Sequence, residues 1–67
     1  MSVYKMIEVV GTSNKSLSEA IQSAVERTAQ TVRNTSWFEV IEQRGTIVNG
    51  KVGEYQVKLA IGFRIDE

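Results

Sequence analysis

The sequence predicts an α+β fold of order β-α-β-β, in which one helix packs on a three-stranded antiparallel sheet. Apolar residues recur at helical spacing in one central segment and at strand-like spacing in the segments around it. The dipeptide Asn49-Gly50 separates two long strand-like segments, and both positions accept the positive φ of a tight hairpin. A chain of 67 residues makes a single domain, residues 1–67.

The first expected strand covers Val3 to Val10, which is rich in β-branched and long apolar residues. Its alternation is imperfect, so we expect both faces of this strand to be partly covered. The segment from Gly11 to Asn14 then predicts a break in the strand.

A helix is expected to begin after Ser16. Ser16 and Glu19 have the spacing of a capping box, in which each side chain satisfies an unpaired amide of the first turn. Asn34 is the predicted stop, because asparagine tolerates left-handed backbone geometry. The apolar stripe consists of Leu17, Ile21, Ala24, Val25, Thr28 and Val32, and the opposite face carries Gln22, Glu26, Arg27, Gln30 and Arg33.

Two long strands are expected to complete the chain, from about Ser36 to Val48 and from about Val52 to Ile65. The second of them alternates cleanly. Its core face should carry Tyr55, Val57, Leu59, Ile61 and Phe63, and its other face Gln56, Lys58, Ala60, Gly62 and Arg64.

A two-residue loop at Asn49-Gly50 also predicts the register of the hairpin, because the pairing runs back from Val48 opposite Lys51. The expected core-face pairs are Phe38 with Ile61 and Val40 with Leu59, and the pairs on the face without the helix are Trp37 with Gly62 and Gln43 with Gln56. Gly62 should leave open space beside the indole. The same register places Glu42 and Arg44 on the core face and Ile41 outside it, and a bulge near Gly45 or Gly53 would change that parity.

Composition restricts the function. The formal net charge is zero, which argues against a partner held by phosphate electrostatics, such as duplex DNA. No apolar run approaches the ~18 residues of a membrane span, and no charged-then-apolar leader precedes the first strand. We therefore expect a soluble, cytoplasmic protein with neither a nucleic-acid partner nor a membrane partner.

The chain has no cysteine and no histidine, so disulfides and ordinary zinc or haem sites are excluded. Neither a Cys–His nor a Ser–His pair can form. We expect no metal site, no catalytic residues and no enzyme activity. A domain of this size usually needs a further source of stability, and assembly into an oligomer is the one that remains.

Trp37 is the single tryptophan, and the register turns it away from the core. A large aromatic side chain in that place is covered either by another subunit or by a bound ring. Gln56, Arg44 and Arg64 likewise have two interpretations. They are ordinary solvated strand residues or ion-pair partners, or they contact a ligand.

The sequence resembles that of bacterial dodecins along nearly the whole chain, and this resemblance favours one of the alternatives. The matching motifs are Val9-Val10-Gly11-Thr12-Ser13, Ala20-Ile21-Gln22, Trp37-Phe38-Glu39-Val40, Arg44-Gly45, Tyr55-Gln56-Val57 and Gly62-Phe63-Arg64. The resemblance implies a hollow homododecamer built from trimers. It also implies paired flavin rings, sandwiched at a two-fold interface between a tryptophan from each of two subunits.

By this resemblance, Trp37 stacks on the flavin ring and the Gln56 amide matches the edge of that ring that carries both acceptors and a donor. Arg44 and Arg64 favour FMN, with riboflavin or FAD as alternatives. Some bacterial members also bind coenzyme A, and Arg27, Thr31 and Arg33 fall on the matching segment.

The leading hypothesis is a flavin storage and buffering protein that sequesters FMN, in which Trp37 quenches the photoexcited ring. The main alternatives are a structural homo-oligomer without flavin and a cage that binds coenzyme A. A single-strand nucleic-acid binder that stacks bases on Trp37 and a flavin-dependent oxidoreductase are the other two.

Overall fold

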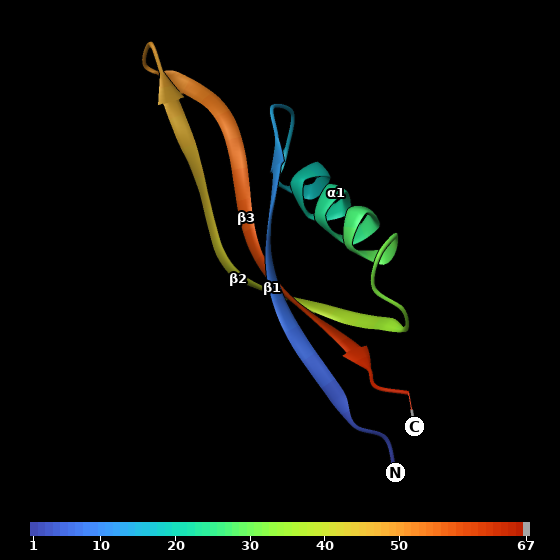
Figure 1. Cartoon of the computed structure of the whole chain (residues 1–67). Coiled ribbons are helices and arrows are strands. Elements are labelled where there is room, and N and C mark those ends of the chain that lie inside the picture. The colour runs from blue at the N-terminus through green and yellow to red at the C-terminus, as the bar shows by residue number, and fades with distance from the viewer. Residues whose placement is uncertain (67) are drawn as a thin grey trace.

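A computed structural model describes residues 1–66 and contains one helix and three strands in the expected order (Figure 1). The elements are β1 (Tyr4–Ser13), α1 (Leu17–Ala29), β2 (Thr35–Val48) and β3 (Lys51–Arg64). All strand pairs are antiparallel, and β3 lies in the centre of the sheet between β1 and β2. The predicted β-α-β-β fold class is therefore confirmed.

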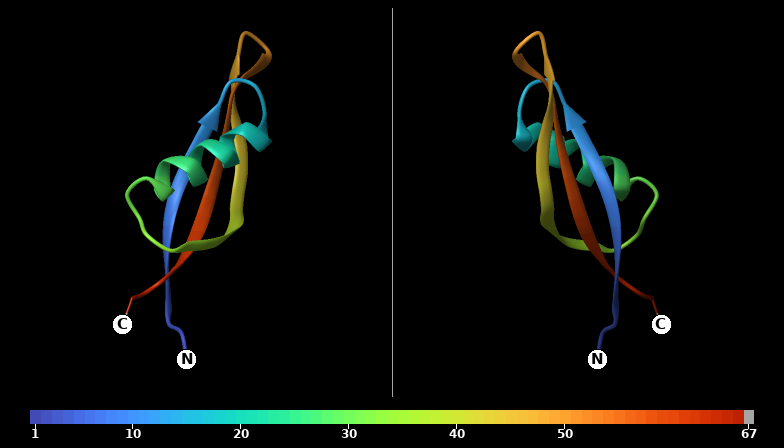
Figure 2. Two further views of the ribbon diagram at one scale, coloured as in Figure 1. Left: turned by 90° about the vertical axis from the view of Figure 1, so that its right-hand side faces the viewer. Right: turned by 90° about the vertical axis from the view of Figure 1, so that its left-hand side faces the viewer.

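The helix crosses one face of the sheet and leaves the other face bare, as the two views of Figure 2 show. It comes close to β1 because Gly11 has no side chain. A Cβ on Gly11 would lie 2.8 Å from the Cβ of Ala24 and nearer still to the carbonyl oxygen of Ala20. Gly11 therefore permits helix packing and does not break the strand. It pairs with Val57, and β1 continues to Ser13, so the predicted break at Gly11 was wrong.

The core lies between α1 and the central strand. Val57 and Leu59 of β3 are completely buried, and so is Ala20 of α1. The predicted helical stripe omitted Ala20 and included Val32, which lies beyond the end of the helix. The remaining core residues are Ala24 and Ile61, and the residues packed around them are Ile7, Val9, Leu17, Ile21 and Val25.

The ends of α1 follow the prediction in part. The Ser16 hydroxyl accepts a hydrogen bond from the Glu19 amide at 3.0 Å, as an N-cap should. The other half of the expected box is replaced, because the Glu19 carboxylate accepts from the Ser13 hydroxyl at 3.4 Å. The helix ends at Ala29 rather than near Asn34, which has the expected left-handed geometry (φ 63°) in the loop before β2.

The hairpin between β2 and β3 turns at Asn49 (φ 53°) and Gly50 (φ 75°), as predicted. The pairs Trp37 with Gly62, Phe38 with Ile61 and Val40 with Leu59 are also confirmed.

A bulge at Ile41 changes the register between these pairs and the turn. Beyond it, Glu42 pairs with Lys58, Gln43 with Val57 and Arg44 with Gln56, until a second irregularity between Gly45 and Ile47 restores the first register. The predicted pairing of Gln43 with Gln56 was therefore wrong. Because one extra residue reverses the faces of a strand, Glu42 and Arg44 lie on the bare face and not on the core face.

The subunit is elongated, and β2 has no buried residue. The helix lies mainly over β1 and β3. Phe38 is therefore 46% exposed although it lies on the helix side of the sheet, and the prediction that it enters the core was wrong. The radius of gyration is 13.8 Å, whereas a compact domain of this length has one of about 11 Å. The hairpin extends well past the helix in Figure 1, and the N-terminus and the end of β3 lie at the opposite end of the subunit.

Candidate functional site

The face of the sheet without the helix, here called the bare face, carries the flavin-site residues that the sequence suggested. Alternation along the paired strands places Trp37 and Arg44 of β2 on this face, together with Gln56 and Arg64 of β3. Other residues on this face include Tyr4, Met6, Glu8, Val10 and Thr12 of β1, Glu39 and Glu42 of β2, and Lys58, Ala60 and Gly62 of β3.

One end of the bare face, the aromatic end, is formed by Tyr4, Trp37 and Arg64. The Trp37 indole lies over Gly62. A Cβ on Gly62 would be 2.8 Å from the indole Cδ2 and closer to two other ring atoms. The predicted open space beside the indole is thus filled by the indole itself. The Tyr4 ring lies against it, with 4.9 Å between centroids and 53° between planes. Trp37 nevertheless keeps 43% of its surface exposed.

The centre of the bare face is an ion-pair cluster that joins all three strands. The Lys58 ammonium lies 3.3 Å from a Glu8 oxygen on β1 and 4.0 Å from a Glu42 oxygen on β2. All three side chains are partly exposed, so each pair contributes little to stability. The cluster separates the aromatic end from the opposite end of the face.

The opposite end of the bare face is here called the amide end. It contains a series of hydrogen bonds that passes through the Gln56 side chain. Arg44 Nε donates to Gln56 Oε1 at 2.7 Å, and Gln56 Nε2 donates to Glu54 Oε1 at 2.9 Å. The Arg44 guanidinium also lies 3.6 Å from Glu42. Arg44 and Gln56 meet because of the bulge at Ile41, which gives them a common pair position in the sheet.

The two ends are far apart within one subunit. Gln56 and Gly62 are separated by six steps of β3 (62 − 56), which is roughly 20 Å at ~3.4 Å per residue. A ring stacked on Trp37 is therefore out of hydrogen-bonding reach of Gln56 in the same subunit. The structure brings Trp37 near Arg64 and Gln56 near Arg44, but does not bring the two pairs together.

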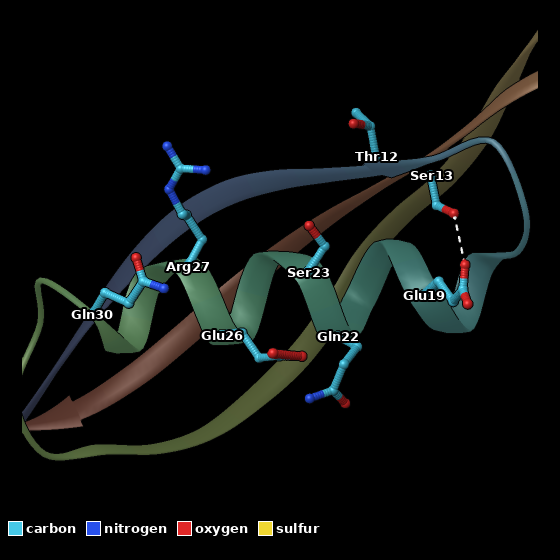
Figure 3. A pocket seen from close by; sticks show the side chains of 8 residues that line it. All are labelled: Thr12, Ser13, Glu19, Gln22, Ser23, Glu26, Arg27 and Gln30. Carbon is cyan, nitrogen blue, oxygen red and sulfur yellow. Dashed lines mark hydrogen bonds between the residues drawn. The ribbon is translucent and has the colours of Figure 1, made fainter.

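A large hollow lies elsewhere on the described surface, beside α1 and the end of β1 (Figure 3). It is an open groove of about 510 Å³ with a polar lining. Ser13 and Glu19 are at one end of it and Arg27 and Gln30 at the other, as Figure 3 shows.

The residues suggested for coenzyme A are divided between two hollows. Arg27 lines the groove beside α1, whereas Thr31 and Arg33 line a second hollow of about 400 Å³ that also includes Arg64. Arg33 forms an ion pair with Asp66 at 3.4 Å. The three predicted residues therefore do not form one cluster in the subunit.

Tyr4 and Glu54 were missed by sequence reasoning. Tyr4 reaches the indole through the pairing of β1 with β3, and that pairing follows only from the strand order in the sheet. Glu54 precedes the Tyr55-Gln56-Val57 motif by one residue and carries no local signal of its own.

Among residues 1–66, no group of three or more Asp, Glu, Cys or His side chains is arranged to hold a metal ion. In the same part of the chain, α1 is neither long nor apolar enough to cross a membrane.

Comparisons with known proteins identify relatives along the whole chain. The family model described as Dodecin matches residues 3–66. A dodecin of Thermus thermophilus is 54% identical over 65 residues, which cover 97% of this chain and 94% of that protein. A calcium dodecin of Mycobacterium tuberculosis is 35% identical over 65 residues, 97% of this chain and 92% of that protein. A crystal structure of a T. thermophilus protein superposes with a TM-score of 0.95 at 52% identity, covering 100% of this chain and 98% of the other.

Proposed function

Because the chain belongs to the dodecin family, we propose that it stores and buffers FMN and is a binding protein rather than an enzyme. The observation that carries the proposal is the placement of Trp37. Its indole is supported from below by Gly62 and from the side by Tyr4, yet 43% of its surface is open. A supported and exposed aromatic ring is a platform for a flat aromatic ligand.

Stacking on this platform would also explain a protective role. An indole in contact with a photoexcited flavin donates an electron to it and so returns the flavin to its ground state before it reacts further. In the paired arrangement that the family resemblance implies, two flavins lie between the Trp37 side chains of two subunits. Both faces of each ring are then covered, which leaves no room for a substrate.

The roughly 20 Å of β3 between Gln56 and Gly62, the residue over which Trp37 lies, supports a site shared between subunits. One subunit would provide the stacking platform, and the Gln56 amide for the same flavin would come from another subunit. Arg64 lies at the aromatic end and lines a hollow with Thr31 and Arg33. A guanidinium there suits the FMN phosphate, which riboflavin lacks.

The exposed surface supports assembly, and we extend the proposal to the hollow dodecamer of trimers that the resemblance implies. The subunit exposes 4996 Å² at 7.5 kDa, whereas a compact monomer of that mass exposes about 4,250 Å². The excess includes large apolar side chains of the hairpin, such as Ile47 at 80% exposure and Val52 at 58%. Surface of this kind is normally covered by a partner.

Coenzyme A binding stays a prediction from the resemblance. Arg27 is in a different hollow from Thr31 and Arg33. A coenzyme A that contacts all three residues would therefore have to extend across both hollows or bridge two subunits.

A fluorescence titration tests the proposed function. FMN is titrated with flavin-free protein, and the quenching is followed against the ratio of flavin to chain. We expect strong quenching that saturates at equal amounts of flavin and chain. Trp37→Ala should weaken binding by about tenfold or more, since ring stacking is worth about 0.5–1.5 kcal/mol beyond the buried area, and should abolish the quenching.

The oligomeric state of Trp37→Ala separates the proposal from a structural role. Under our proposal, size-exclusion chromatography shows an intact oligomer that has lost its flavin. If wild-type protein does not quench FMN and Trp37→Ala dissociates the oligomer, Trp37 is an interface residue and flavin storage is wrong. Repeating the wild-type titration with riboflavin tests the phosphate contact, which should make FMN the tighter ligand.

A further inference from the structure

The hydrogen-bond chain at the amide end has a fixed direction. Arg44 Nε donates to Gln56 Oε1 at 2.7 Å, and Gln56 Nε2 donates to Glu54 Oε1 at 2.9 Å. A guanidinium has only donors, and an ionised carboxylate has only acceptors. Rotating the Gln56 amide by half a turn would therefore oppose donor to donor and acceptor to acceptor. The two charged neighbours permit only one orientation of the amide.

We propose that Glu54 is a positioning residue that fixes the orientation of the Gln56 amide, and that it thereby makes the site selective for rings with an N–H donor next to a carbonyl acceptor. The inference rests on the proposed flavin function and specifies what the site recognises. It assigns Glu54 an action through Gln56, without contact to the flavin.

The hydrogen-bonding groups of Gln56 that Arg44 and Glu54 do not use support this selectivity. Its amide carries two acceptor lone pairs and two N–H donors, and the chain with Arg44 and Glu54 uses one of each. One lone pair on Oε1 and one N–H on Nε2 remain, and both atoms are bonded to the same carbon, Cδ. They match an edge that presents an N–H beside a carbonyl oxygen, such as the pyrimidine edge of flavin.

Both bonds of the chain are charge-assisted, because one partner in each is ionised. Such bonds are roughly twice as strong as neutral ones. Two of them hold a side chain that would otherwise rotate freely, so the amide is oriented before a ring arrives and less ordering is required on binding. If Glu54 is replaced by glutamine, the side chain at that position can donate as well as accept, so the orientation of the Gln56 amide is held by Arg44 alone.

A selectivity measurement tests the assignment. Dissociation constants are measured for riboflavin and for 3-methylriboflavin, in which a methyl group replaces the hydrogen of the ring N–H. Riboflavin is chosen because it carries no phosphate, so a change in the charge of the protein affects both ligands alike. Wild-type protein should prefer riboflavin by about tenfold or more, because the methylated ring leaves the Gln56 acceptor without a donor.

Glu54→Gln should weaken riboflavin binding by about fivefold and 3-methylriboflavin binding by much less, so that the preference falls. Glu54→Asp keeps an acceptor-only carboxylate and should restore part of the preference. Glu26→Gln on α1 makes the same chemical change away from the bare face and should leave both constants unchanged.

If Glu54 has a purely structural role, Glu54→Gln weakens the binding of both ligands by the same factor and leaves the preference for riboflavin unchanged. That result would overturn the assignment. An unchanged preference in Glu54→Gln with unchanged affinities would overturn it as well. If wild-type protein binds neither these two ligands nor FMN, the proposed flavin function fails together with the assignment. If wild-type protein binds both equally, only the assignment fails.

Discussion

Replacing Gly62 with alanine would place a methyl group directly beneath the indole of Trp37. The added Cβ would lie 2.8 Å from the indole Cδ2 and closer to two neighbouring ring atoms. Carbon atoms in good contact are about 3.5–4.0 Å apart. The indole must therefore move by about 1 Å or more, or turn to another rotamer.

The size of the effect follows from that displacement. Overpacking costs about 1–3 kcal/mol in a closed core, but the indole is partly exposed and can move outward, so we expect a loss of about 1 kcal/mol in the free energy of unfolding. We expect flavin binding to be affected more clearly than stability, because the displaced indole is the surface on which the flavin stacks. Loss of well-aligned stacking, worth about 0.5–1.5 kcal/mol, weakens binding by about 2- to 13-fold.

The assay combines chemical unfolding, tryptophan emission and FMN titration on the same preparation. Gly50→Ala is the matched control, because a Cβ at Gly50 meets no atom within 4 Å but must adopt a φ of 75°. That strain costs about 1–2 kcal/mol, so the control loses comparable stability while the indole stays in place. Its affinity for FMN should equal that of the wild-type protein.

Two results would refute the reasoning. If Gly62→Ala binds and quenches FMN as the wild-type protein does, the indole does not need the space above Gly62. If Gly50→Ala loses as much affinity as Gly62→Ala, the loss reflects general destabilisation and not the position of the indole.

Two further predictions concern the helix. Gly11→Ala should lower the free energy of unfolding by about 1–3 kcal/mol, because its methyl group meets the backbone carbonyl of Ala20, which cannot move aside as a flexible side chain would. Urea unfolding measures this loss, and a stability equal to that of the wild-type protein would contradict the close packing of α1 on β1. Ser16→Ala should lower the free energy of unfolding by about 1 kcal/mol, because the Glu19 amide loses its capping acceptor. Ser16→Asp keeps an acceptor and should lower the free energy of unfolding much less. Equal losses in the two Ser16 variants would argue against the cap.

Much of the candidate site was predictable. Asn49-Gly50 predicts the pairing of Trp37 with Gly62 on the bare face, and this pairing is present because the two irregularities of β2 between the turn and Trp37 cancel each other. The placement of Arg44 was not predictable. A bulge at Ile41 moves it to the bare face, and neither glycine nor proline marks that position in the sequence.

The sequence by itself determined the order of the elements, the turn and the N-cap. These features depend on neighbouring residues, on a period of two or 3.6, or on the short loop of one hairpin. The tertiary structure alone decided that Gly11 admits the helix, that Tyr4 supports the indole, and that Arg44, Gln56 and Glu54 form one chain. Each of these depends on how distant segments pair, and a single extra residue in a strand exchanges its two faces.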